Sequence, residues 1–180
     1  MSTPTPPATS DAPLDNFSHC HDGILVELNA MSALPELARA AQQARRQADA
    51  VLQFYRKVVK NHHDEDERVL FDAVLRSAGA GEEHARVKAI TERLTREHRE
   101  VEAQFVGLEP ELKKLARGDD CQLDGAALQS LVQQYRAHAE FEEAEFLPLA
   151  HSILSRDSNH MAALGLSLHV RHVALPSSAT

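Results

Sequence analysis

The chain of 180 residues is long enough to bury the core of one domain. It has 27 acidic and 19 basic side chains and a net charge of −8, which excludes nucleic acid and anionic membrane surfaces as expected partners. Only seven glycines, few aromatic residues and abundant alanine, leucine, glutamate, glutamine and arginine favour helices, and no apolar run is long enough to span a bilayer.

The two ends of the chain lack the pattern of a folded core. Residues 1–13 are rich in serine, threonine, proline and alanine, without the basic start and apolar centre of a secretory signal. We therefore expect a disordered tail and a cytoplasmic protein. A domain over residues 14–155 should be followed by a short helix, residues 156–173, packed on it, and by a loose tail at 174–180.

The first half of the domain predicts two helices. Asp15 or Ser18 is the expected N-terminal cap of the first. Pro35 interrupts that helix or opens the next one in its first turn, where proline is tolerated. The second helix is expected from about Glu36 to Ser77, because the Gly-Ala-Gly sequence at residues 79–81 is a clear break.

The second half predicts two more helices. The third should begin near Glu82, and Pro110 should kink it or end it. A turn is expected at residues 117–120, where a glycine follows a basic residue. Asp124 is then the expected cap of the fourth helix.

Two of these helices carry a histidine and a carboxylate on the face that should be apolar. His62 and Asp66 continue the apolar stripe of the second helix, and His138 and Glu142 continue that of the fourth. Residues four apart on a helix lie on one face, roughly 5–6 Å from each other. A buried carboxylate without a partner is costly, so a cation held between the two side chains is the favoured explanation.

The two halves of the domain repeat one another. His21 in the first helix and His98 in the third each lie three residues before an aliphatic residue, and each is followed at nearly the same spacing by one histidine–carboxylate pair. The repeat predicts two helical hairpins that close into an all-α, up-down-up-down four-helix bundle with a metal site inside. The expected inner ligands are His21, His62, Asp66, His98, His138 and Glu142.

The donor atoms of this set limit which metal ions are expected to bind. Imidazole nitrogen and carboxylate oxygen suit iron, manganese or zinc, and two carboxylates can bridge a pair of cations. Four histidines would leave open coordination positions for a small ligand. Cysteine is absent from the set, which argues against an iron–sulfur cluster. Cys20 and Cys121 lie far apart outside any motif and are expected to be free thiols.

The doubled His…His-x-x-x-Asp/Glu pattern resembles the hemerythrin-like, or HHE cation-binding, domain, over roughly His19 to Leu149. The resemblance implies a four-helix bundle with a non-haem di-iron centre, that is, two iron ions with an oxo or hydroxo bridge. By position it implies four terminal ligands, His21, His62, His98 and His138, and two bridging carboxylates, Asp66 and Glu142.

The third helix departs from the family pattern. Oxygen-carrying hemerythrins place two histidines four residues apart on this helix, whereas here Leu94 precedes His98 and Glu102 follows it at that distance. The resemblance therefore does not extend to the ligand set for reversible oxygen carriage, and Glu102 is a candidate replacement ligand. Asp66 also stands where glutamate is usual in the family, and its side chain is one methylene shorter.

The second helix offers an alternative pair. His63 and Glu67 lie about a quarter turn from His62 and Asp66. The alignment of the hairpins favours His62 and leaves His63 near the site or on the surface, and it leaves open whether Asp66 or Glu67 bridges. Further candidates for a ligand or an outer contact are His63, Glu67, Glu102, Tyr135 and Glu145.

These observations favour a metal-binding protein over a dedicated enzyme. We expect it to bind or sense a small ligand such as oxygen or nitric oxide at a dimetal centre. The resemblance also admits an enzyme that acts on peroxide or nitric oxide, and a protein of iron supply or repair. The expected partner is a diatomic or peroxide molecule, and the oligomeric state is left open. A purely structural bundle is disfavoured, because six unpaired polar groups would cost several kcal/mol.

Overall fold

The computed structural model describes residues 13–157, and every regular element in that part is helical, which confirms the all-α prediction there. The chain divides into two compact units, one up to Arg45 and one from Arg46 onward. No helix in the described part combines the length and the apolar character needed to cross a membrane. The predicted tails and fifth helix lie outside the described residues, apart from their inner ends.

The first unit contains helix α1 (Pro13–Met31) and the start of α2 (Leu34–Phe54). The described side chains of α1 are exposed, including the apolar Ile24 and Leu28. Pro35 is the second residue of α2, where its missing N–H leaves no helical hydrogen bond unmade. The prediction that Pro35 opens the second helix is therefore confirmed.

The described part of the second unit, residues 46–157, is built on three helical rods. The first continues from α2 and ends at Ser77, as predicted. Two of its turns are π-helical, and in each the N–H of the next residue donates to a carbonyl five positions earlier. Each π turn holds more residues than an α turn and so rotates the helical segment after it. The segments are η1 (Tyr55–Val59), α3 (Lys60–Glu65), η2 (Asp66–Leu70) and α4 (Phe71–Ser77).

The second rod is α5 (Glu82–Arg117), which begins where it was predicted. Gly81, with φ of 92°, precedes it, and Gly118, with φ of 81°, ends it in the left-handed conformation that glycine adopts at little cost. Pro110 lies inside the helix, so the interpretation that it ends the helix is wrong. Leu108 and Leu112, on either side of it, are buried, and this packing outweighs the lost hydrogen bond.

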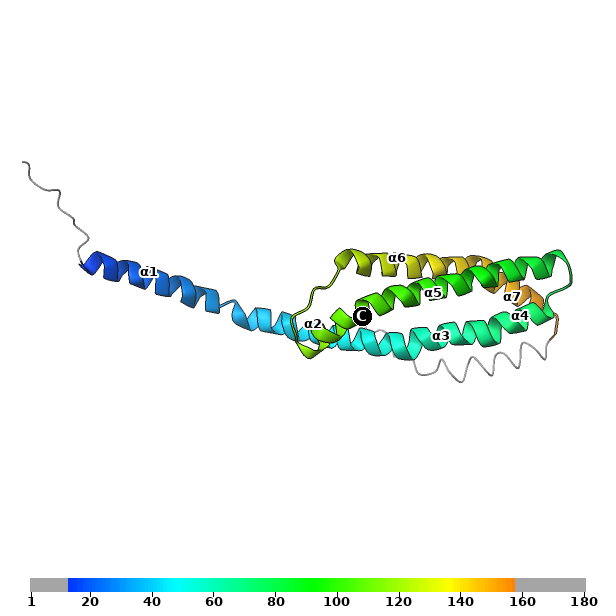
Figure 1. Ribbon diagram of the computed structural model, residues 1–180, viewed down its shortest axis with the longest axis horizontal. Helices are drawn as coiled ribbons and strands as arrows, with labels where there is room; N and C mark the ends of the chain where they lie inside the picture. Colours follow the sequence, from blue (N-terminus) through cyan, green and yellow to red (C-terminus); the bar gives the residue numbers. More distant parts are fainter. Residues whose placement is uncertain (1–12, 158–180) are drawn as a thin grey trace, which may run out of the picture. The chain divides into compact units, whose positions relative to one another are not determined.

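The third rod joins α6 (Gly125–Phe141), the π turn η3 (Glu142–Phe146) and α7 (Leu147–Leu154). Asp124 caps α6 as predicted: its side chain accepts hydrogen bonds from the N–H groups of Ala126 and Ala127, at 2.9 and 3.0 Å. Within this unit α5 lies alongside both the α3–α4 rod and the α6–α7 rod (Figure 1). The segments α4 and α7 also contact each other, so each of the three rods contacts both of the others.

Two apolar clusters stabilise the second unit. One joins α4, η3 and α7 to the first half of α5, around Phe71, Leu94 and Phe146. The other joins α2 to the second half of α5, around Leu52 and Phe105. Along each rod a set of buried polar residues lies between the two clusters: His63, Asp66, His98, His138 and Glu142.

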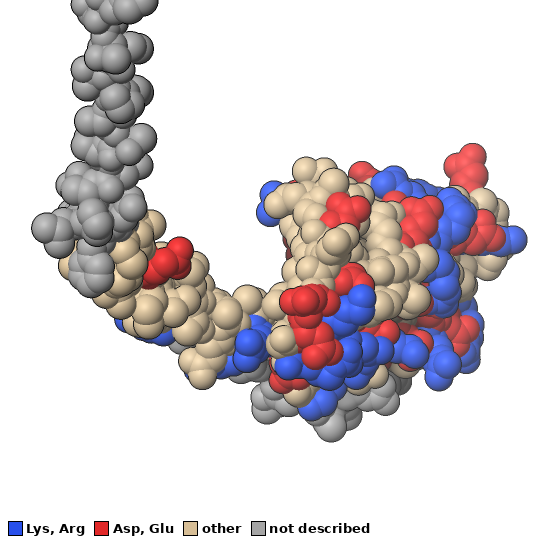
Figure 2. All heavy atoms as spheres, turned by 60° about the vertical axis from the view of Figure 1, so that its left-hand side comes forward, with Lys and Arg blue, Asp and Glu red and all other residues tan. Residues whose placement is uncertain are grey.

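The surface of the second unit mixes both signs of charge, as the blue and red side chains in Figure 2 show. Several of these charges pair within α5, for example Lys88 with Glu92 and Arg93 with Glu97. Exposed pairs of this kind add little to stability, so the two apolar clusters carry most of the folding free energy.

Removing the α6 cap should destabilise the second unit. Asp124→Ala leaves two N–H groups at the start of α6 without their acceptor, and we expect a loss of about 1 kcal/mol in unfolding free energy. Asp120→Ala, at an exposed aspartate of the same loop, is the control. Urea unfolding followed by circular dichroism measures both. Equal unfolding midpoints for the two variants would show that the cap contributes nothing.

Candidate metal centre

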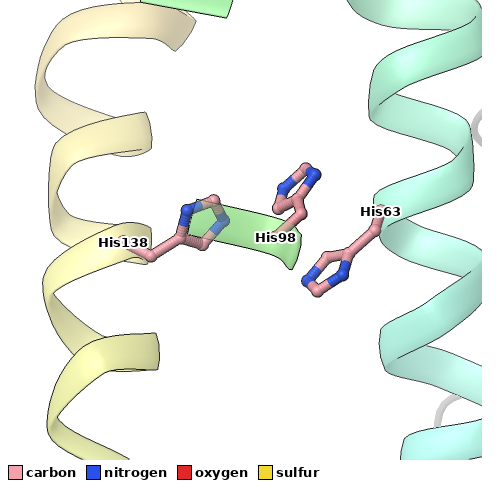
Figure 3. Close-up of side chains that lie close together, drawn as sticks. All are labelled: His63, His98 and His138. Carbon is pink, nitrogen blue, oxygen red and sulfur yellow. The ribbon is translucent and has the colours of Figure 1, made fainter. Parts of the chain in front are cut away.

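Three histidines from three different rods meet in the buried polar layer. His63 comes from α3, His98 from α5 and His138 from α6, and their rings turn toward a common space (Figure 3). One ring nitrogen from each lies within 4.8 Å of the others. Their exposures are 1%, 0% and 2%, so water has almost no access to them.

The two ring nitrogens of each imidazole differ in their contacts. The Nδ1 atoms face carboxylates: Glu102 at 3.1 Å from His63, Glu67 at 2.9 Å from His98 and Glu97 at 3.1 Å from His138. The three Nε2 atoms are buried and have no hydrogen-bond partner within residues 13–157. Buried polar atoms are nearly always satisfied, so three such nitrogens around one space require an explanation.

The protonation of the rings follows from these contacts. A carboxylate only accepts, so the Nδ1 that faces it carries the hydrogen. Burial and the neighbouring histidines lower the pKa of His98 to about 2, and burial lowers the pKa of His63. Both rings are therefore neutral near pH 7, with the lone pair of Nε2 directed inward. This is the tautomer that binds a metal ion, and the donor set fits one.

A second trio adjoins the first. His62 from α3, Asp66 and Glu142 bring one ligand atom each within 4.8 Å of one another. His62 Nε2 lies 3.4 Å from Asp66 Oδ2, and His138 Nε2 lies 3.7 Å from Glu142 Oε2, so His138 links the two trios. Asp66 and Glu142 are the first residues of the π turns η2 and η3. The sequence repeat is thus also a repeat of local backbone geometry.

Burial and neighbouring carboxylates change the protonation of the two acidic side chains of this trio. Burial, and then the charge of Glu142, raise the pKa of Asp66 from 3.8 to about 8. Burial, and then Glu143, raise the pKa of Glu142 from 4.5 to about 7. Asp66 Oδ2 is also buried, and no described residue forms a hydrogen bond with it. A divalent cation between these groups would supply the missing charge and replace their protons.

Five of the six predicted inner ligands lie in the two trios. They are His62, Asp66, His98, His138 and Glu142. The sixth, His21, is an exposed residue of α1 in the first unit, and its role as a ligand stays a prediction.

The other candidates divide into two groups. His63 is buried in the first trio, so the interpretation that it lies on the surface is wrong; Glu67 and Glu102 contact the Nδ1 atoms of the trio. The Tyr135 ring lies 5.9 Å from that of His138, and burial, Glu142 and Asp66 raise the pKa of its phenol. Glu145, by contrast, is exposed and pairs with Arg86 at 3.3 Å.

Two features of the centre differ from the sequence prediction. His63 lies four residues after the buried Val59 and eleven after the buried Leu52, so regular helical spacing from these two core residues points to His63. The apolar stripe that predicts His62 runs instead through Val51, which is exposed. Glu97 was not predicted at all, because its partner His138 lies on another rod and the pattern within one helix cannot show contacts between helices.

Comparison with known proteins identifies the family of the chain. No curated protein and no solved structure shows significant similarity to it. The family model of the hemerythrin HHE cation-binding domain, however, matches residues 12–150, which is well over half of the chain and includes both histidine–carboxylate pairs. The chain therefore belongs to the hemerythrin HHE cation-binding domain family.

Proposed function

We propose that this protein binds two metal ions, iron in the first place, at the two adjoining trios, and that the centre binds or senses a small ligand such as oxygen or nitric oxide. The observation that carries the proposal is the set of three buried imidazoles that bring one ring nitrogen each within 4.8 Å of the others, and whose Nε2 atoms have no hydrogen-bond partner among the described residues. Manganese and zinc accept the same donor types and are the alternative metals.

The two trios are chemically different. The first offers three imidazoles, and the second offers one imidazole and two carboxylates. We assign the bridging role to Asp66 and Glu142, because both are buried and both begin a π turn. Glu67, the alternative bridge, is already in contact with Nδ1 of His98, which supports an outer position for it.

The proposal includes a fourth helix. We infer that α1 completes the bundle and that His21 is a further ligand. The support is the sequence repeat, in which His21 occupies the position in the first hairpin that His98 occupies in the second. The apolar side chains of α1, such as Ile24 and Leu28, are exposed in the described structure, and an exposed apolar stripe marks an interaction face.

The residues of the chain and the metal have separate roles. When bound, iron would supply a redox-active Lewis acid with coordination positions open to a small molecule. The neutral imidazoles of His63 and His98 provide lone pairs, and Asp66 and Glu142 provide negative charge that offsets the cations. Tyr135 keeps its proton near neutral pH and offers a hydrogen-bond donor beside the site.

The ligand assignment is tested by a visible spectrum. We expect the iron-loaded protein to show charge-transfer absorption that changes on addition of oxygen or nitric oxide and returns when the gas is removed, because the donor set leaves coordination positions open. Spectra recorded anaerobically and after each addition measure this. Irreversible consumption of nitric oxide or peroxide would instead indicate an enzyme, and a spectrum unaffected by either gas would contradict the proposal.

Removing a trio histidine should remove metal. We expect His63→Ala and His98→Ala each to weaken Fe²⁺ binding by more than about tenfold, since each deletes a nitrogen donor. His84→Ala, at an exposed position of α5, is the matched control. His21→Ala should weaken binding as well if α1 closes the bundle. Metal analysis after anaerobic loading, with chelator competition, measures all four variants; wild-type affinity in His98→Ala would refute the site.

The metal-free protein should become less stable as the pH rises from 6.5 to 8. The folded-state pKa values of Asp66 and Glu142, about 8 and about 7, exceed their unfolded values, so their stabilising contribution is lost as the pH rises through the folded values. The lowered pKa of His98 makes the folded protein more stable as the pH rises, but only up to about pH 6.5, the pKa of a histidine in the unfolded chain. It therefore does not change the stability between pH 6.5 and 8. We expect a net loss of about 2 kcal/mol, measured by urea unfolding in the presence of a chelator.

A neutral substitution separates function from stability. Asp66→Asn removes the group that must ionise in the core, so the variant should be more stable than the wild type at pH 8 without metal, while its metal binding is weaker. Asp72→Asn, on the same rod and in an exposed pair with Arg76, is the control. If Asp66→Asn kept the full pH dependence, the raised pKa would not be the cause.

A further inference from the structure

Arginine side chains lie outside the carboxylates that face the three imidazoles. Each carboxylate that faces an Nδ1 atom also contacts an arginine. Arg99 Nη2 lies 2.5 Å from Glu67 Oε2, and Arg99 Nη1 lies 3.3 Å from both oxygens of Glu102. Arg93 Nε lies 2.7 Å from Glu97 Oε1. The order imidazole, carboxylate, guanidinium therefore occurs three times around one site.

Arg99 differs from Arg93 because it serves two carboxylates. Glu67 comes from η2 on the first rod, and Glu102 comes from the next turn of α5. One planar guanidinium thus links the two groups that contact His98 and His63. Those two rings stack with their centroids 3.9 Å apart, so a shift of either carboxylate would disturb both rings.

We propose that Arg99 is a positioning residue, which holds the rings of His63 and His98 in the orientation for metal binding through Glu102 and Glu67. The inference rests on the proposed function, because it assumes that the first trio binds a metal. It extends that function to a residue that contacts no ligand atom of the metal.

The geometry explains why the carboxylates need this support. Glu67 and Glu102 are each partly exposed, so either side chain can turn toward water unless something holds it. The guanidinium presents its N–H donors in a fixed plane and binds carboxylates directionally. Arg99 itself is 54% exposed, and exposed ion pairs add little to stability. Its main effect should therefore be on the orientation of the rings rather than on folding.

Arg93 provides an internal comparison. It contacts Glu97, the partner of His138, and its guanidinium also lies 3.4 Å above the ring of Phe141. It reaches only one of the three imidazoles. Loss of Arg93 should therefore weaken metal binding less than loss of Arg99, because loss of Arg99 frees the carboxylates that hold two of the imidazoles.

The test uses the full-length protein and Co²⁺, whose visible bands report both its affinity and its coordination geometry. We expect Arg99→Met to weaken Co²⁺ binding by about 10–100-fold and to shift the bands, as loss of an outer contact to a ligand does. Arg99→Lys should recover only part of the affinity. Lysine restores the positive charge, but a single ammonium group cannot hold both carboxylates at once. Arg93→Met should have a smaller effect.

Arg86→Met is the matched control. Arg86 lies on the same helix, is 61% exposed and pairs across the unit with Glu145, but it contacts none of the carboxylates that face the trio. Glu67→Gln removes the charge between Arg99 and His98 while Arg99 remains, and it should reproduce part of the Arg99→Met effect. Thermal unfolding of each metal-free variant confirms that it is folded.

The outcomes separate the two proposals. If the wild type binds Co²⁺, His98→Ala does not, and Arg99→Met matches Arg86→Met in affinity and spectrum, the positioning role is wrong while the metal site stands. If the wild type and His98→Ala bind Co²⁺ equally weakly, the metal site fails and the role of Arg99 fails with it. A weakened and spectrally altered Arg99→Met beside an unchanged Arg86→Met supports the inference.

Discussion

The second unit encloses a layer of buried polar groups whose burial a bound cation would offset. Five polar side chains occupy the layer where a helical core would normally hold leucine or valine. Without a cation, two carboxyl groups keep their protons into the neutral range, and three imidazole nitrogens have no hydrogen-bond partner in the part of the chain that the structure describes. Each such group is costly in a domain whose total stability is only about 5–15 kcal/mol. Under the proposed function, metal binding would offset this cost, because a ligand that binds only the folded state stabilises it.

The apolar clusters on either side make that arrangement possible. Phe71, Leu94 and Phe146 pack on one side of the polar layer, and Leu52 and Phe105 pack on the other. They hold the three rods together independently of the metal, so the side chains of the polar layer meet before any ion binds. A site assembled in this way loses less conformational entropy when it binds its ligand. The polar layer lowers the folding stability of the metal-free domain, and in return its side chains are already arranged for binding.

Local signals in the sequence predicted where the helical rods begin and end. Contacts between the rods, which the sequence does not show, determine which carboxylates face the histidines of the centre. The Gly-Ala-Gly break, Asp124 and Pro35 each act within a few residues, and the helix ends follow them. The repeat pointed to His98 and Glu142, because it depends on spacing along the chain. Contacts between helices, such as that of Glu97 with His138, leave no periodic trace in one sequence. The same holds for the contact of Arg99 with Glu67.

The place of each side chain on its rod explains why two adjacent histidines serve one centre. In a regular α-helix His62 and His63 are about 100° apart, so their side chains leave the helix in different directions. His63 is buried and lies in the first trio, while His62 is partly exposed and lies with Asp66 in the second. On the third rod His138 lies in the first trio, and Glu142, one turn further along the same face, lies in the second. The first and third rods thus contribute to both trios, the first through two neighbouring histidines and the third through two residues one turn apart.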